Sequence, residues 1–223
     1  MTVVERLERE LSRWEIGADG IVHALAILAG IVGAVVLLLV AADRIGAFGM
    51  VAVSVYSAGL LAMLICSAAY NLGRRTRYGN WLRNLDQAAI FVMIAGTYTP
   101  FTLLHMDGAW RASLTILVWS IALAGILTRL LTQRLFDRLA VVFYLTLGWM
   151  SVITVAPLMS GVNAPMIVVA LLAAGGLLYT IGVVFHLWRR LPYNNVIWHG
   201  FVAAAAAAHF AAVLVSMVAP PAA

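Results

Sequence analysis

Seven long apolar stretches alternate along the chain with shorter segments that carry most of its charged residues. The stretches cover approximately residues 19–42, 47–72, 85–104, 109–130, 137–157, 165–187 and 195–218. Each holds about 20 residues or more, which lets an α-helix cross a hydrocarbon core of about 30 Å. Helices are required because no water satisfies backbone polar groups at that depth, and the sequence has no strand-length alternation typical of a membrane barrel. We therefore predict an all-α integral membrane protein built as a bundle of seven transmembrane helices.

The basic residues predict the orientation of this bundle. All fourteen are arginines, and they gather in alternate connections between the apolar stretches. Only Arg44 and Arg111 lie on one side, which leaves twelve before the first stretch and in or beside the second, fourth and sixth connections. Cytoplasmic segments carry the excess of Lys and Arg. The amino terminus is therefore predicted to be cytoplasmic and the carboxyl terminus to lie outside.

Composition excludes an ordinary soluble domain. The chain is 64% hydrophobic and 10% charged, with a mean hydropathy of +1.01, and a soluble fold of this size cannot bury so much apolar surface. The net charge of +5 is one that nucleic-acid-binding proteins also carry. Here the arginines follow the membrane topology, so we expect membrane lipids as neighbours and no nucleic acid. The sequence does not identify any protein partner.

The two ends of the chain differ from the apolar region between them. Residues 1–18 are charged throughout, and Val3, Leu7, Leu11 and Trp14 recur at helical spacing, which predicts a short amphipathic helix on the inner membrane face. A solvated cap is the alternative interpretation. Residues 19–218 form the predicted seven-helix domain, and 219–223 are expected to be a frayed tail. Asp19 at the start of the first stretch is interpreted as a helix cap.

Polar residues at membrane depth are the candidates for a functional site, because ionisable groups in a bilayer are costly. Ser67 and Asn71 end the second stretch, Asp86 begins the third, and Asn195 and His199 begin the seventh. The i,i+4 spacing of Ser67 with Asn71, and of Asn195 with His199, places each pair on one helix face. Since successive helices alternate in direction, these side chains are predicted to form a polar pocket near the cytoplasmic surface.

Three further histidines lie within the stretches. His23 and His186 are predicted to lie at about the depth of His199, whereas His209 comes ten residues after His199 and therefore about 15 Å farther along the helix. Each alone is interpreted as a hydrogen-bonded core histidine. His105, at the outer end of the third stretch, is expected in a loop.

Several motifs in order resemble one known family. The run of residues 86–101 reads DQAAIFVMIAGTYTPF, and it is followed by Gly148-Trp149, GGLLYTIG over 175–182, IWHGFV over 197–202 and His209-Phe210. Together they resemble the hemolysin III family, the bacterial branch of the progestin and adipoQ receptors, which includes the adiponectin receptors. The resemblance implies seven helices with the amino terminus inside, and a multi-pass protein of the bacterial inner (plasma) membrane.

The resemblance also implies a zinc site near the cytoplasmic face. In the family, zinc is held by one histidine on helix two and two on helix seven, and an aspartate on helix three orients a zinc-bound water. The corresponding positions here are Asn71, Asn195 and His199, with Asp86 and Ser67 retained. Amide oxygens are weak ligands for zinc. We therefore expect the family's zinc site to be degenerate in this chain.

Two arrangements remain open for this pocket. One is a relocated zinc site that uses Asp86, His23, His186 and His199. The other, which we prefer, is a hydrogen-bonded cluster in which Asn71 and Asn195 serve as donors and acceptors for Asp86 and His199.

These observations leave three functions open. The first is a hemolysin III-like membrane protein, lipid-related or membrane-homeostatic, that is not a hydrolase. The second is a zinc-dependent lipid amide hydrolase of the ceramidase-like kind, with Asp86 orienting a metal-activated water and Ser67 beside it. The third, a pore-forming channel, has less support because the sequence shows no inverted repeat and one clear intramembrane carboxylate.

Overall fold

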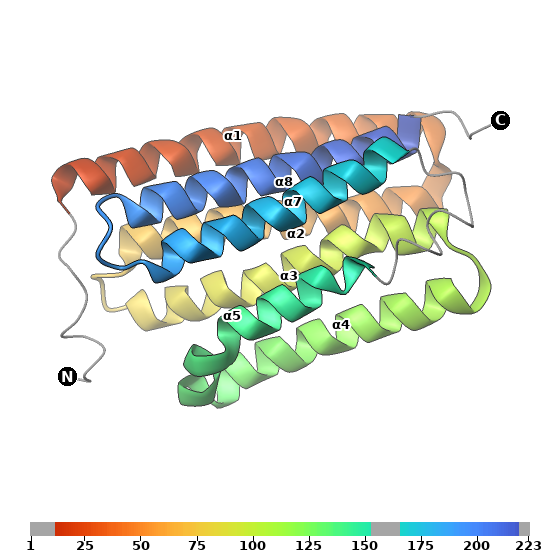
Figure 1. Ribbon diagram of the computed structural model, residues 1–223. Helices are drawn as coiled ribbons and strands as arrows, with labels where there is room; N and C mark the ends of the chain where they lie inside the picture. Colours follow the sequence, from red (N-terminus) through yellow and green to blue (C-terminus); the bar gives the residue numbers. More distant parts are fainter. Residues whose placement is uncertain (1–11, 153–165, 219–223) are drawn as a thin grey trace.

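The computed structural model describes residues 12–152 and 166–218, and every regular element within them is an α-helix. The helices are α1 (Arg13–Arg44), α2 (Gly46–Gly73), α3 (Gly79–His105), α4 (Gly108–Leu131), α5 (Gln133–Trp149), α7 (Met166–Leu187) and α8 (Asn194–Val218). They lie side by side and alternate in direction along the chain (Figure 1). The predicted helical membrane bundle is thus confirmed for the part of the chain that is described.

Six of these helices are long and apolar enough to cross a membrane. The exception is α5, whose apolar part is the shorter segment Leu139–Trp149. The stretch predicted over 137–157 extends past residue 152 into residues outside the described part. The count of seven spans therefore stays a prediction.

The first helix begins earlier than its apolar stretch. Ser12 is the N-cap of α1: its side-chain oxygen accepts from the Glu15 backbone N–H at 3.2 Å, and Glu15 Oε2 accepts from the Ser12 N–H at 2.8 Å. This capping box satisfies two donors at the helix start. The interpretation of Asp19 as a helix cap is therefore wrong, because Asp19 lies inside α1 and is 5% exposed.

The segments assigned to the two chain ends are described only in part. Residues 13–18, placed by the sequence in the amphipathic segment, continue directly into α1. Residues 1–11 and the tail 219–223 lie outside the described residues.

Helices α2 and α3 approach each other closely in the core. A Cβ atom at Gly59 would lie 3.2 Å from the carbonyl oxygen of Val92, and one at Gly96 would lie 3.4 Å from that of Val55. Small residues permit such backbone contact between membrane helices. Helix α3 is thereby held at the centre of the bundle, with Phe91, Ala95 and other side chains fully buried.

A tyrosine links α3 to α5. The Tyr98 hydroxyl donates to the carbonyl oxygens of Leu147 at 2.8 Å and Gly148 at 3.2 Å. Tyr98→Phe is expected to lower the free energy of unfolding by about 1 kcal/mol, the usual contribution of one such bond. Denaturant unfolding in detergent measures this, with Tyr193→Phe as the control because Tyr193 is 43% exposed. Equal losses in both variants would contradict the assignment.

One end of the bundle collects the arginines. The start of α1 and the α2–α3, α4–α5 and α7–α8 turns lie at this end, whereas the end of α8 lies at the other (Figure 1). Arg13, Arg74 and Arg189 belong to these segments. We call it the arginine-rich end.

Candidate functional site

An aspartate on α1 lies between two histidines near the arginine-rich end. Asp19 Oδ1 is 2.6 Å from His199 Nδ1 of α8, and Asp19 Oδ2 is 3.6 Å from His23 Nε2. The two imidazole rings have centroids 4.4 Å apart. The exposed fractions of the side chains are 7% for Asp19, 7% for His23 and 11% for His199. These three residues are called the Asp–His–His group below.

The spacing of α1 explains this arrangement. Glu15, Asp19 and His23 follow at intervals of four, so they share one face of the helix, and all three are buried. Glu15 Oε1 accepts from the backbone N–H of Tyr193 at 2.7 Å in the turn before α8. The same face thus fixes the start of α8 and places His199 opposite Asp19.

Asn71 joins the group from α2. Its Nδ2 lies 3.4 Å from His23 Nε2 and donates to the Ser67 carbonyl oxygen at 3.0 Å. Asn195 lies one turn before His199 on α8 and is partly buried. It is not a member of the Asp–His–His group.

Asp86 and Ser67 lie beside the group. The Ser67 side chain contacts the Asp86 carboxylate, whose charge also interacts with His199, His23 and Arg83. Asp86 is therefore a second carboxylate whose charge acts on both histidines. Helices α1, α2, α3 and α8 each supply polar side chains to this region.

The other histidines lie outside the group. The His186 ring packs on Trp198 with centroids 5.0 Å apart. His209 Nε2 is 3.3 Å from the Leu172 carbonyl oxygen, in space that exists because residue 175 is glycine: a Cβ there would overlap the imidazole. His105 is the last residue of α3.

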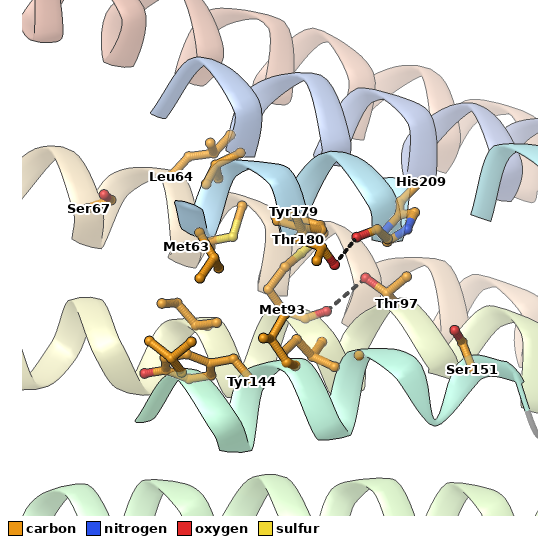
Figure 2. Close-up of a pocket in the computed structure, with 18 of the residues that line it drawn as sticks. Met63, Leu64, Ser67, Met93, Thr97, Tyr144, Ser151, Tyr179, Thr180 and His209 are labelled. Atoms are coloured by element: carbon orange, nitrogen blue, oxygen red, sulfur yellow. Dashed lines mark hydrogen bonds between the residues drawn. The ribbon is translucent and has the colours of Figure 1, made fainter. Parts of the chain in front are cut away.

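A cavity of about 240 Å³ extends from this polar region between the helices. Its polar end is formed by His23, Ser67, Asp86, Gln87 and His199. Most of the remaining lining is apolar, with Met63, Leu64 and Met93 among it, and Figure 2 shows Ser67 and Ser151 toward opposite ends. The buried Gln87 Oε1 atom has no hydrogen-bond partner among the described residues, so it can accept from a bound molecule.

Most of the residues at the positions where the family resemblance predicts zinc ligands are not of the types that zinc prefers. Asn71 directs its amide nitrogen, a donor, toward Ser67 and His23. Asn195 offers a second neutral amide, so His199 is the one ligand of the type zinc prefers at these positions. The groups that can hold a metal within the described residues are instead Asp19, His23 and His199, whose ligand atoms all lie within 4.8 Å of one another.

The sequence interpretation missed the roles of Asp19 and Glu15. The signal was present: Asp19 and His23 are an i,i+4 pair at the depth of His199, and Ser12 with Glu15 has the capping-box spacing. Glu15 lies within the charged segment 1–18 and Asp19 directly follows it, so the sequence pattern favoured a solvated or capping role for them.

Comparisons with known proteins identify one family and several relatives. A sequence model of the family described as "Haemolysin-III related" matches residues 18–210. The chain is 34% identical over 197 residues to the "Hemolysin-3 homolog" of Bacillus subtilis (strain 168), covering 88% of this chain and 92% of that protein. It is 31% identical over 197 residues to "Hemolysin-3" of Bacillus cereus (88% and 89%). It is also 28% identical over 208 residues to the human "Monocyte to macrophage differentiation factor" (90% and 83%). No solved structure matches the chain significantly.

Proposed function

The chain belongs to the haemolysin III-related family, and from this premise we propose that it is a lipid-related protein which holds an amphiphilic lipid in its cavity. The resemblance inferred from the sequence motifs is confirmed by the family match. The protein is a multi-pass membrane protein. Its proposed location is the bacterial inner membrane, and its proposed role is in membrane homeostasis.

The proposed topology has seven spans, with the amino terminus in the cytoplasm. Six apolar helices and the shorter apolar part of α5 support this count. The arginine-rich end supports the orientation, since Arg74, Arg75 and Arg77 lie in one turn there. The polar end of the cavity then lies close to the cytoplasmic headgroups.

The cavity is the observation that carries the proposal. Ligand pockets combine mostly apolar walls with a few polar groups that fix orientation. Here Ser67, Asp86 and Gln87 lie at one end of the cavity, where they are available to a headgroup. The Gln87 Oε1 atom, which has no partner within the described part of the chain, is an acceptor for a hydroxyl or amide N–H. The apolar remainder suits a hydrocarbon chain, so the cavity as a whole fits an amphiphile.

Filling the cavity tests this function. Gly176 lines the cavity, and a Cβ there meets no atom within 4 Å, so Gly176→Leu introduces a side chain at the cavity wall where its first carbon has room. We expect the lipid that co-purifies with the protein to fall at least tenfold, as measured by mass spectrometry of extracts.

Gly200→Leu is the matched control. Gly200 is an exposed helical glycine, and a Cβ there also meets no atom within 4 Å. This variant should retain wild-type lipid. Unchanged lipid in Gly176→Leu, with the fold intact by circular dichroism, would refute the proposed occupant.

A zinc-dependent lipid amide hydrolase is the second candidate. The specific observation in its favour is that His23, His199 and Asp86 all line the same cavity. The unsuitable amides at the family's zinc positions count against it. Ceramide turnover by the purified protein, abolished in Asp86→Ala, would favour the hydrolase; retained lipid without turnover favours the binding protein.

A further inference from the structure

We propose that Asp19, His23 and His199 form a divalent metal site of the zinc type, with a ligand set different from the family's. Two ligands come from α1 and one from α8. The proposal stands on these side chains alone, so it holds whether or not a lipid occupies the cavity.

The spacing of the ligand atoms suits a small cation. Zinc lies 2.0–2.2 Å from nitrogen and oxygen ligands in tetrahedral sites, so neighbouring ligand atoms are about 3.4 Å apart. The separation of Asp19 Oδ2 and His23 Nε2 is 3.6 Å. Asp19 Oδ1 and His199 Nδ1 are at the hydrogen-bond distance of 2.6 Å, and they need to separate by about 1 Å to share an ion of that size.

The contacts of His23 Nε2 are long. Asn71 Nδ2 lies 3.4 Å from it and Asp19 Oδ2 lies 3.6 Å from it, whereas N–H···O hydrogen bonds in proteins are usually about 2.9–3.0 Å. An imidazole nitrogen is a ligand that zinc prefers. A cation held between Asp19 and His23 therefore displaces no short hydrogen bond of His23 Nε2.

The local charge also favours a dication. Asp19 and Asp86 place two carboxylates near the imidazoles of His23 and His199 in an apolar bundle, and Glu15 adds a third acidic group one turn before Asp19. Arg83 is the basic side chain that interacts with Asp86. Buried carboxylates need compensating positive charge. An ion held by Asp19 supplies it.

The ligand types select the metal class. Two imidazoles and one carboxylate form a set that catalytic zinc sites use, with the fourth position open. Calcium and magnesium prefer sites made of oxygen ligands. Zinc, with cobalt(II) as its spectroscopic substitute, is therefore the probe.

Metal content of the purified protein tests the site. The full chain in detergent is stripped with chelator, reloaded with zinc, freed of unbound ion and measured by elemental analysis. We expect about one zinc per chain, and background levels in Asp19→Asn, His23→Asn and His199→Asn. Cobalt(II) should give the visible absorption of a four-coordinate ion in the wild type and lose it in the same variants.

Two controls separate this site from nonspecific binding and from the family's ligand set. His186→Asn removes a histidine that lines the same cavity but lies outside the group, and Asn195→Ala changes a family ligand position. Both should retain one zinc. Zinc binding that is lost in Asn195→Ala, or retained in Asp19→Asn, would overturn the proposal, as would wild type without zinc.

A second measurement uses the wild type alone, so it does not depend on whether the variants fold. Zinc should raise the thermal midpoint of the stripped wild type and release protons on binding. No shift of the midpoint with zinc would also overturn the proposal.

Discussion

Asp19→Ala is expected to lower the free energy of unfolding of the metal-stripped protein by about 3–5 kcal/mol, the cost of removing one partner from a buried ionic pair. Asp19 is the acceptor for His199 at 2.6 Å and lies 3.6 Å from His23. Its removal leaves both imidazoles buried without their carboxylate. The change is measured by denaturant unfolding in detergent.

Asp43→Ala is the control on the same helix. Its side chain is 79% exposed, beside Arg44, and an exposed pair contributes about 0–1 kcal/mol. The double variant Asp19→Ala/His199→Ala should be less destabilised than the sum of the single changes, since neither then leaves the other unpaired. If Asp19→Ala and Asp43→Ala cost the same, the carboxylate does not organise this region.

The helical architecture could be predicted because the bilayer restricts what an apolar stretch can form. The stretch predicted over 165–187 is α7 (Met166–Leu187) almost to the residue, and that over 195–218 is α8 (Asn194–Val218). The length of the apolar stretch did not predict where α1 begins, because the first turns of this helix are polar and are stabilised by a cap. Ser12 and Glu15 carry that information in a pattern other than hydropathy.

The depth of the polar residues in the membrane could also be predicted from the sequence. Alternating helix direction places the end of α2 and the starts of α3 and α8 at one end of the bundle, so Ser67, Asp86 and His199 were expected there. The rotation of each helix was not accessible, because an apolar helix surrounded by lipid and other helices has little amphipathic contrast. The sequence therefore could not show that His186 packs on Trp198 and stays outside the Asp–His–His group.

Asp19 shows why the site chemistry needed the structure. The sequence offers Asp86 and Asp19 as carboxylates at similar depth, and either is within reach of a histidine. Which one pairs with His199 depends on how α8 packs against α1, and this is set by the bond from Glu15 to the α7–α8 turn. That contact joins residues 178 positions apart, so no local pattern reports it.

Glu15→Ala is accordingly expected to lower the free energy of unfolding by about 2–4 kcal/mol, since it removes the capping box and a charged acceptor together. Glu15 is 3% exposed, and its two oxygens accept from Ser12 and Tyr193 separately. Glu15→Gln keeps one carbonyl oxygen and should lose about half as much. Thermal and denaturant unfolding in detergent measure both. Hydrogen exchange of the Tyr193 turn distinguishes the two effects. We expect its protection to fall in Glu15→Ala, because the Tyr193 N–H then has no buried acceptor and α8 is free to shift His199 away from Asp19. Unchanged protection would mean that the loss is confined to the start of α1.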